Sequence, residues 1–134
     1  MKLIKQTLSS ATGVLPNTAS VIALDAANTF QEVDGFGFTL TGGSATLIKK
    51  LPAASRTALL NELFGRSETG IWVSYLRVSV GASDLSASVF SYNDLAIGQT
   101  DIGLTQFTLA QDTIDLIPVL QEILSINPAI KIMA

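Results

Sequence analysis

Ser74-Tyr75-Leu76-Arg77-Val78-Ser79-Val80-Gly81-Ala82-Ser83-Asp84 contains an apolar segment of strand length, with one arginine inside it and one aspartate just after its end. The apolar run begins at Ile71 and is typical of a strand buried on both faces, as in a parallel sheet covered by helices. An unpaired guanidinium in an apolar interior would cost several kcal/mol, so Arg77 must face water, a carboxylate or a ligand. We therefore expect an α/β fold with a site at the carboxyl end of this strand.

The segments on either side of this strand alternate between strand and helix patterns. Residues 35–44 couple a short apolar strand to a glycine-rich turn, and Ser44 is a good N-cap for a helix over 45–50. Pro52 starts a second helix that Gly65 closes, residues 112–125 predict a third with a kink at Pro118, and residues 130–133 start another strand. The apolar stripes expected on the second and third helices are Leu59, Leu60, Leu63 and Phe64, and Ile117, Leu120, Ile123 and Leu124. This alternation indicates the beginning of a parallel α/β series, interrupted by a long polar loop over 81–109.

The first 34 residues have a β pattern instead. Short strands are predicted at 3–8, 20–24 and 29–33, with a turn at 25–28 between the last two. We therefore expect a small antiparallel element ahead of the α/β series.

Composition excludes several classes of function. The 134 residues fit one domain, and 48% apolar against 14% charged residues argues against disorder. A net charge of -3 with eight basic residues leaves no electrostatic footprint for nucleic acid. The absence of cysteine and histidine excludes disulfides, a Ser-His-Asp triad and the usual zinc ligand sets within this chain. Its chemistry must use carboxylates, hydroxyls, lysine or arginine, and we expect no cofactor.

Membrane insertion and export signals are also weak. No apolar run approaches the roughly 18 residues that span a bilayer, so we expect no integral membrane protein. Residues 1–5 begin like a signal peptide, but Lys5 and Gln6 break the apolar core after two residues. We expect that any export signal has been removed or was never present, and the compartment stays open.

Two residues stand out as candidates for a binding site. Arg77 could form a structural ion pair with an acidic residue of a neighbouring element, or it could fix a catalytic carboxylate or hold a substrate hydroxyl. Asp84 could be a turn or capping residue, or a ligand-binding carboxylate. Because both lie at the carboxyl end of one strand, where parallel α/β folds bind ligands, together they favour a site.

Other motifs fit structural roles better. The glycines of Gly35-Phe36-Gly37 and Thr41-Gly42-Gly43 lack the dinucleotide-binding spacing and favour tight backbone packing at a first barrel strand. Aromatic residues in the long loop could stack on a sugar, but anchoring of the loop is favoured, and Trp72 is expected in the core. The aromatic residues are Phe90, Tyr92 and Phe107; Asp94, Asp101, Asp112 and Asp115 lack a metal-loop spacing and fit solvated or capping roles.

Several short motifs occur in a specific order: Phe30-Gln31-Glu32-Val33-Asp34-Gly35-Phe36-Gly37, Thr41, Tyr75-Leu76-Arg77-Val78, Ala82-Ser83-Asp84, Phe90-Ser91-Tyr92, Phe107-Thr108-Leu109 and Leu116-Ile117-Pro118. From about residue 20 onward, this combination resembles the amino-terminal part of glycoside hydrolase family 30, and above all its glucosylceramidase-like branch. Three positions depart from the pattern. Trp72 stands where the family commonly has glycine, Gly42 where some members have an acidic residue, and Leu85 where an aromatic residue can follow the aspartate.

The resemblance implies a (β/α)8 TIM barrel with a side β-sandwich. Residues 1–28 would belong to the sandwich and residues 29–134 to the first part, about strands 1–3, of an incomplete barrel. It also implies retaining hydrolysis of β-glycosides such as glucosylceramide, with a carbohydrate or glycolipid substrate and a secreted, periplasmic or lysosome-like location. Arg77 would lie beside the nucleophilic glutamate, and Asp84 would hold sugar hydroxyls.

A (β/α)8 barrel needs about 250 residues, so the chain supplies at most two β/α units and the start of a third strand. The family's two catalytic glutamates follow the fourth and seventh strands, so the resemblance gives neither a counterpart here. We expect the chain alone to be inactive and to need the rest of the barrel or self-association to cover its sheet. The alternative is a non-catalytic carbohydrate-binding or assembly module derived from the start of a barrel.

Overall fold

The computed structural model describes residues 13, 20–23, 25–68 and 70–134. The chain divides into two compact units, Met1–Glu32 and Val33–Ala134. In the first unit the turn predicted at 25–28 is confirmed, because the Asp25 carboxylate accepts hydrogen bonds from the Ala27 amide at 2.9 Å and the Asn28 side chain at 2.6 Å. The strand predicted at 3–8 lies outside the described residues. Those predicted at 20–24 and 29–33 are wrong for the residues that are described, since the exposed backbone there pairs with no other strand.

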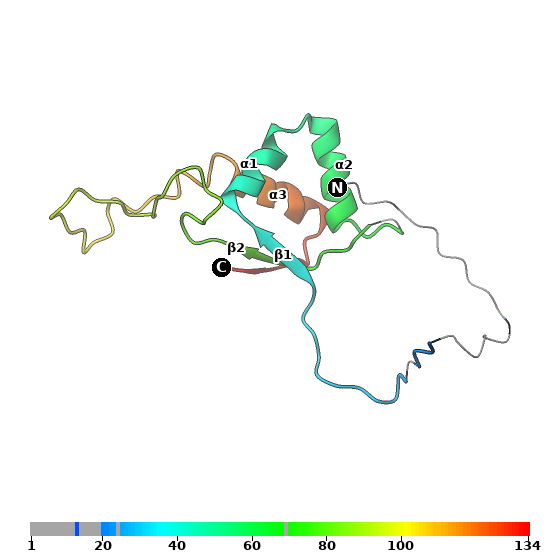
Figure 1. Ribbon diagram of the computed structural model, residues 1–134. Coiled ribbons are helices and arrows are strands. Elements are labelled where there is room, and N and C mark those ends of the chain that lie inside the picture. Colours follow the sequence, from blue (N-terminus) through cyan, green and yellow to red (C-terminus); the bar gives the residue numbers. More distant parts are fainter. Residues whose placement is uncertain (1–12, 14–19, 24, 69) are drawn as a thin grey trace. The chain divides into compact units, whose positions relative to one another are not determined.

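The second unit alternates strands and helices, as predicted. Its elements are β1 (Gly37–Leu40), α1 (Gly42–Lys50), α2 (Ala53–Phe64), β2 (Tyr75–Val78), α3 (Leu116–Ile126) and β3 (Lys131–Met133). The strands form a parallel sheet in the order β1-β2-β3, in which Leu40 pairs with Val78 and Arg77 with Met133. All three helices lie on one side of this sheet (Figure 1). This arrangement is that of an α/β protein at the start of a parallel series.

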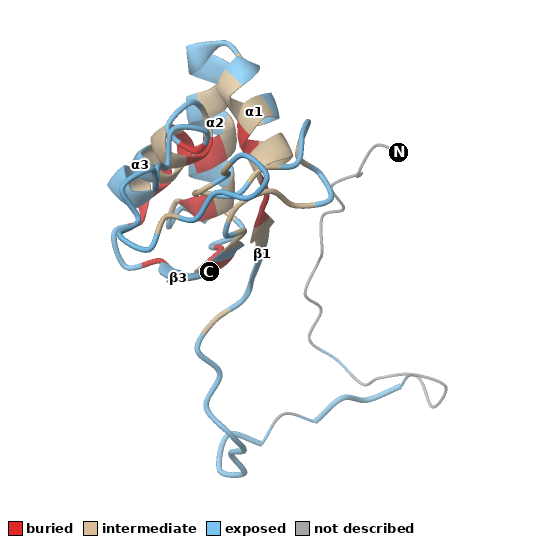
Figure 2. Cartoon of the chain, turned by 90° about the vertical axis from the view of Figure 1, so that its left-hand side faces the viewer, coloured by how far each residue is buried: buried red, intermediate tan, exposed pale blue. Residues whose placement is uncertain are grey.

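The core lies between the helices and the sheet. Figure 2 shows that the buried residues gather there, and they are Leu40, Ala45, Leu60, Phe64, Val73, Leu76, Leu116, Val119, Ile123 and Ile130. Within Val33–Ala134, no described helix or strand covers the opposite face, on which Arg77 of β2 is exposed, so β2 is buried there on one face rather than on both as predicted. The stripe predicted on α2 contributes Leu60 and Phe64, whereas Leu124 of α3 is 38% exposed. Ile123 of the stripe predicted on α3 is nonetheless fully buried and Leu120 packs against the core, so that stripe is confirmed in part, and Leu116 and Val119 complete the buried face of α3.

Two helix starts differ from the predictions. Thr41, not Ser44, caps α1, because the Thr41 hydroxyl oxygen accepts a hydrogen bond from the Ser44 amide at 3.2 Å. The helix accordingly begins earlier, at Gly42. α3 begins later, at Leu116, so Pro118 lies in the first turn, where a missing N–H breaks no interior hydrogen bond. The predicted kink within this helix therefore has no cause.

Glycines allow the backbone to approach closely at the first strand, as predicted. A Cβ at Gly37 would lie 1.4 Å from the Tyr75 carbonyl oxygen, and one at Gly43 would lie 2.2 Å from the Leu85 carbonyl oxygen. Only the absence of a side chain lets β2 and the loop after it pack where they do.

The predicted core position of Trp72 is wrong, because its side chain is 56% exposed. Its indole N–H donates a hydrogen bond of 2.7 Å to the Ser67 carbonyl oxygen. Its backbone has φ of 60°, in the left-handed region that glycine adopts freely and other residues adopt at a cost of about 1–2 kcal/mol. This conformation agrees with the resemblance, in which glycine is common at this position.

Candidate functional site

The carboxyl ends of the three parallel strands border a cavity of about 470 Å³. Its lining includes Thr41 after β1, Ser79 after β2, Ala134 after β3, and both predicted site residues, Arg77 and Asp84. The structure therefore brings the two candidates to one cavity, at the edge of the sheet where parallel α/β proteins bind ligands.

Arg77 lies on the uncovered face of the sheet and is exposed. Its neighbour Leu76 points the other way and is fully buried in the core. No ion pair to Arg77 occurs within the described residues, so the structural ion pair weighed for this residue is not formed there. A second cavity of about 250 Å³ borders Arg77, and Thr39, Tyr75 and Met133 are among the residues that line it. The guanidinium donors are thus available to a group that approaches this face.

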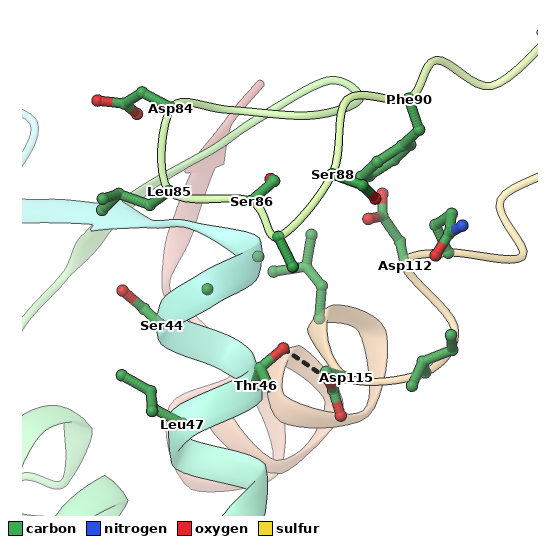
Figure 3. A pocket seen from close by; sticks show the side chains of 16 residues that line it. Ser44, Thr46, Leu47, Asp84, Leu85, Ser86, Ser88, Phe90, Asp112 and Asp115 are labelled. Atoms are coloured by element: carbon green, nitrogen blue, oxygen red, sulfur yellow. Dashed lines mark hydrogen bonds between the residues drawn. The ribbon is translucent and has the colours of Figure 1, made fainter.

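Asp84 lies in a turn that does not use its carboxylate. The Ser83 amide donates to the Ser86 hydroxyl at 3.0 Å, and the Ser86 amide donates to the Ser83 carbonyl oxygen at 3.0 Å. Serine groups thus hold this turn, and within the described residues no hydrogen bond or ion pair engages the exposed Asp84 carboxylate. In Figure 3 its oxygens point away from the other labelled side chains. The interpretation of Asp84 as a capping residue therefore has no support in the geometry.

The aromatic residues of the long loop contact one another and the body of the unit. The rings of Phe90 and Tyr92 lie 6.4 Å apart, and those of Tyr92 and Phe107 lie 5.7 Å apart in an edge-on arrangement. The Tyr92 hydroxyl donates a hydrogen bond of 2.5 Å to the Asp112 carboxylate. Burial and this hydrogen bond raise the pKa of Tyr92, so the phenol stays protonated as a donor. These contacts confirm that the aromatic residues anchor the loop.

The other aspartates of this region also have local partners. Asp94 accepts from the Ser91 amide and hydroxyl, and Asp101 accepts from the Gln106 and Thr105 amides. The hydrogen bonds from Ser91 lower the pKa of Asp94, and those from the Gln106 and Thr105 amides lower the pKa of Asp101. Within the described residues no group of three or more histidine, cysteine, aspartate or glutamate side chains could hold a metal ion. None of the described helices has the length and hydropathy of a membrane span.

A larger cavity of about 560 Å³, not foreseen from the sequence, lies between the start of α1 and the two ends of the long loop (Figure 3). Asp84 lies on its rim, and Ser44, Phe90 and Asp112 line it. The Asp115 carboxylate accepts a hydrogen bond of 2.6 Å from the Thr46 hydroxyl, which joins α3 to α1 beside this cavity. No local sequence pattern could reveal this bond, because its partners are 69 residues apart.

Comparison with known proteins agrees with this geometry. Residues 33–134 match the glycosyl hydrolase family 30 TIM-barrel domain. An endo-1,6-β-D-glucanase of Neurospora crassa is 35% identical over 77% of this chain, and the lysosomal acid glucosylceramidase of Mus musculus is 30% identical over 82% of it. The solved structure of an endo-β1,6-glucanase, 35% identical, superimposes with a TM-score of 0.70 over 81% of this chain and 23% of its own.

The chain spans 21% of the length of each of the two relatives from Neurospora and mouse. The matched residues hold β1, β2 and β3, the cavity at their carboxyl ends, and both predicted site residues. The chain therefore belongs to glycosyl hydrolase family 30.

Proposed function

We propose that this chain forms the sugar-positioning part of a retaining β-glycosidase. The observation that carries the proposal is the shared cavity of Arg77 and Asp84 at the carboxyl ends of the strands, in a chain that belongs to family 30. TIM-barrel enzymes place their active sites at this end of the barrel. The family and the geometry thus support the same location for substrate.

The two residues would have different roles. A carboxylate that no described residue engages, such as that of Asp84, can accept charge-assisted hydrogen bonds from two sugar hydroxyls. The Arg77 guanidinium has five donors and suits a carboxylate, so it would orient and keep ionised a nucleophilic glutamate. A retaining enzyme also needs two carboxyl groups about 5 Å apart across the scissile bond. Among the described residues no glutamate lines this cavity, so we expect other segments of the barrel to supply both.

The substrate would be a β-glucoside. The mouse relative is a glucosylceramidase, which supports the expected glycolipid substrate. The Neurospora relative is an endo-1,6-β-D-glucanase, and it is more similar to this chain, at 35% identity against 30% for the mouse relative. This similarity supports 1,6-linked β-glucan as a second candidate substrate. Both candidates present a glucosyl group whose hydroxyls Asp84 could bind, so they share the proposed role of this residue.

The test uses the complete gene product that contains these residues, assayed on an aryl β-glucoside, glucosylceramide and β-1,6-glucan. Asp84→Ala should lower kcat/KM by about 10–150-fold, the effect of losing hydrogen bonds to a charged group. Asp94→Ala, which changes an aspartate of the same loop outside the cavity, is the matched control and should keep its activity. Equal activity of the Asp84→Ala and wild-type proteins would refute the proposed role.

A second outcome separates the enzyme from a binding module. A binding module would bind sugar without hydrolysing it. A reading frame that stops directly after codon 134 would also favour the module. Continuation of the frame, together with hydrolysis of any of the three substrates, would favour the enzyme.

We also propose that the uncovered face of the sheet packs against further barrel segments or a second copy. Met133 lies beside Arg77 on this face and is 49% exposed, and one edge each of β1 and β3 lacks a neighbour among the described residues. Such surfaces favour association. The 134-residue chain should therefore self-associate in light scattering and hydrolyse no aryl β-glucoside. A monodisperse monomer that melts cooperatively would contradict the expected self-association. Measurable turnover of an aryl β-glucoside would contradict the expected inactivity.

A further inference from the structure

Asp112 is the one charged side chain that is buried among the described residues, with 9% of its surface exposed. It lies just before α3, and its backbone is fixed there, because its amide donates to the Leu109 carbonyl oxygen and its carbonyl oxygen accepts from the Ile117 amide. A carboxylate is expensive to bury unless it is hydrogen-bonded. The side-chain partner that the structure gives it is the hydroxyl of Tyr92, at 2.5 Å.

The Tyr92–Asp112 hydrogen bond attaches a residue in the middle of the loop, Tyr92, to the segment just before α3. The Tyr92 carbonyl oxygen also accepts a hydrogen bond of 2.8 Å from the Thr108 amide, so the outgoing and returning parts of the loop meet at this residue. The hydroxyl then fixes this crossing to the segment that enters α3. Figure 3 shows Asp112 beside Phe90 at one side of the 560 Å³ cavity.

The crossing lies close to the segment that carries Asp84. Two residues before Tyr92, the Phe90 carbonyl oxygen accepts a hydrogen bond of 3.0 Å from the Ala82 amide, which closes residues 82–90 into a small loop. Asp84 lies inside it. Gly81, which has φ of 78°, leads the chain into this loop from β2. The position of the Asp84 carboxylate therefore depends on where Phe90 is held, and Tyr92 holds it.

We propose that Tyr92 and Asp112 are positioning residues for substrate: their hydrogen bond holds the 82–90 loop so that Asp84 faces the strand-end cavity. The proposal rests on the sugar-binding role proposed for Asp84. Neither residue needs to touch the scissile bond. Loss of the pair should therefore weaken sugar binding and leave bond cleavage in the bound complex largely unchanged.

The experiment measures KM and kcat of the complete gene product on an aryl β-glucoside, with hydrogen exchange at the amides of residues 82–90. Tyr92→Phe removes one hydroxyl and should raise KM about tenfold, with kcat within about twofold, as expected for a lost hydrogen bond to a charged group. Asp112→Asn retains an acceptor oxygen and should stay within about threefold of wild type. The double variant Tyr92→Phe/Asp112→Ala should be no worse than Asp112→Ala, because both changes remove the same bond.

Ser91→Ala is the matched control, since it removes a hydroxyl from the residue next to Tyr92 whose bond to Asp94 stays within the exposed loop. It should change neither KM nor exchange. A Tyr92→Phe protein with unchanged KM and unchanged exchange at 82–90 would overturn the proposal, as would an equal effect of Ser91→Ala. If the wild-type protein turns over no β-glycoside, the proposed function fails, and the exchange rates alone then decide whether the pair positions the loop.

Discussion

Replacing Gly37 by alanine should break the pairing of β1 with β2. The backbone of Gly37 does not need glycine for its dihedral angles, because its φ is not positive. Its surroundings do, since the new Cβ would lie 1.4 Å from the Tyr75 carbonyl oxygen, whereas real Cβ atoms stay more than about 3.0 Å from such atoms. One strand must therefore move by more than an ångström, and the atom in the way is backbone, which cannot rotate aside.

The size of the effect follows from the strand pairing. β1 and β2 are paired over four residue pairs, Gly37–Tyr75 to Leu40–Val78. At about 1 kcal/mol for each backbone hydrogen bond, losing this pairing would cost about 2–4 kcal/mol. A domain has about 5–15 kcal/mol in total, so the loss is a large part of its stability.

Urea denaturation at one fixed protein concentration, followed by circular dichroism, measures this effect, because association shifts apparent stability with concentration. At a slope of about 2 kcal/mol per molar urea, in the middle of the usual range for small proteins, the Gly37→Ala midpoint should fall by about 1–2 M. Gly42→Ala makes the same chemical change where a Cβ would have only an ordinary contact, 3.6 Å from the Ser86 hydroxyl. It lies at the first position of α1 and should leave the midpoint unchanged or raise it. The reasoning fails if the two variants unfold at the same urea concentration.

Three further changes should follow from the charges of the molecule. Arg56→Met should lower the free energy of unfolding by about 1–3 kcal/mol, because the mostly buried guanidinium binds the Glu122 carboxylate at 2.8 Å. Lys49→Met removes a more exposed partner of Glu122, at 3.6 Å, and should lower it by less than about 0.5 kcal/mol. Comparable losses for the two variants in urea titrations would contradict this. Because the pKa of Tyr92 is raised, its contribution to stability is fully present below the ordinary tyrosine pKa of about 10 and disappears as the pH rises through the higher pKa of the folded state. The stability difference between wild type and Tyr92→Phe should therefore vanish in strong alkali. A difference that persists there would refute this prediction. The lowered pKa of Asp101 has the opposite sign, so its contribution is present above its ordinary pKa of about 4 and is lost as the pH falls through the lower folded pKa. The protection of the amides of residues 105 and 106 against exchange, relative to an unstructured peptide at the same pH, should fall only in that acid range, and an equal loss of protection at neutral pH would argue against it.

Much of the fold could be predicted because apolar spacing is a local property. The run around Leu76 gave the central strand, and the stripe containing Leu60 and Phe64 gave the buried face of α2. Element ends were less predictable. Thr41 and Ser44 are both good N-caps, and only the hydrogen bond from the Ser44 amide to the Thr41 hydroxyl shows which one is used.

The exposed position of Trp72 could not be derived from hydropathy. Large aromatic side chains are usually buried, and its backbone angle depends on how the preceding loop enters β2 rather than on its own type. The glycine expected by the family resemblance was the available signal, since a position that favours glycine often has positive φ. The 60° found for Trp72 gives that signal a physical reason.

The candidate site was predictable where it depended on topology. Parallel strands align their carboxyl ends, so Arg77 and the segment after β2 had to meet the ends of β1 and β3. The supporting contacts were not predictable, because the Tyr92–Asp112 and Thr46–Asp115 hydrogen bonds join residues 20 and 69 apart, with no periodicity to mark them.

The one-sided covering of the sheet makes the strength of Arg77 depend on its surroundings. Open to water, its charge interacts with a carboxylate 4 Å away by only about 1 kcal/mol, because the solvent dielectric constant is near 80. If further segments enclosed the uncovered face and the effective dielectric constant fell to about 20, the same pair would gain about 4 kcal/mol. Enclosure of the barrel would then by itself turn a weakly interacting surface cation into a strong electrostatic partner, without any movement of β2.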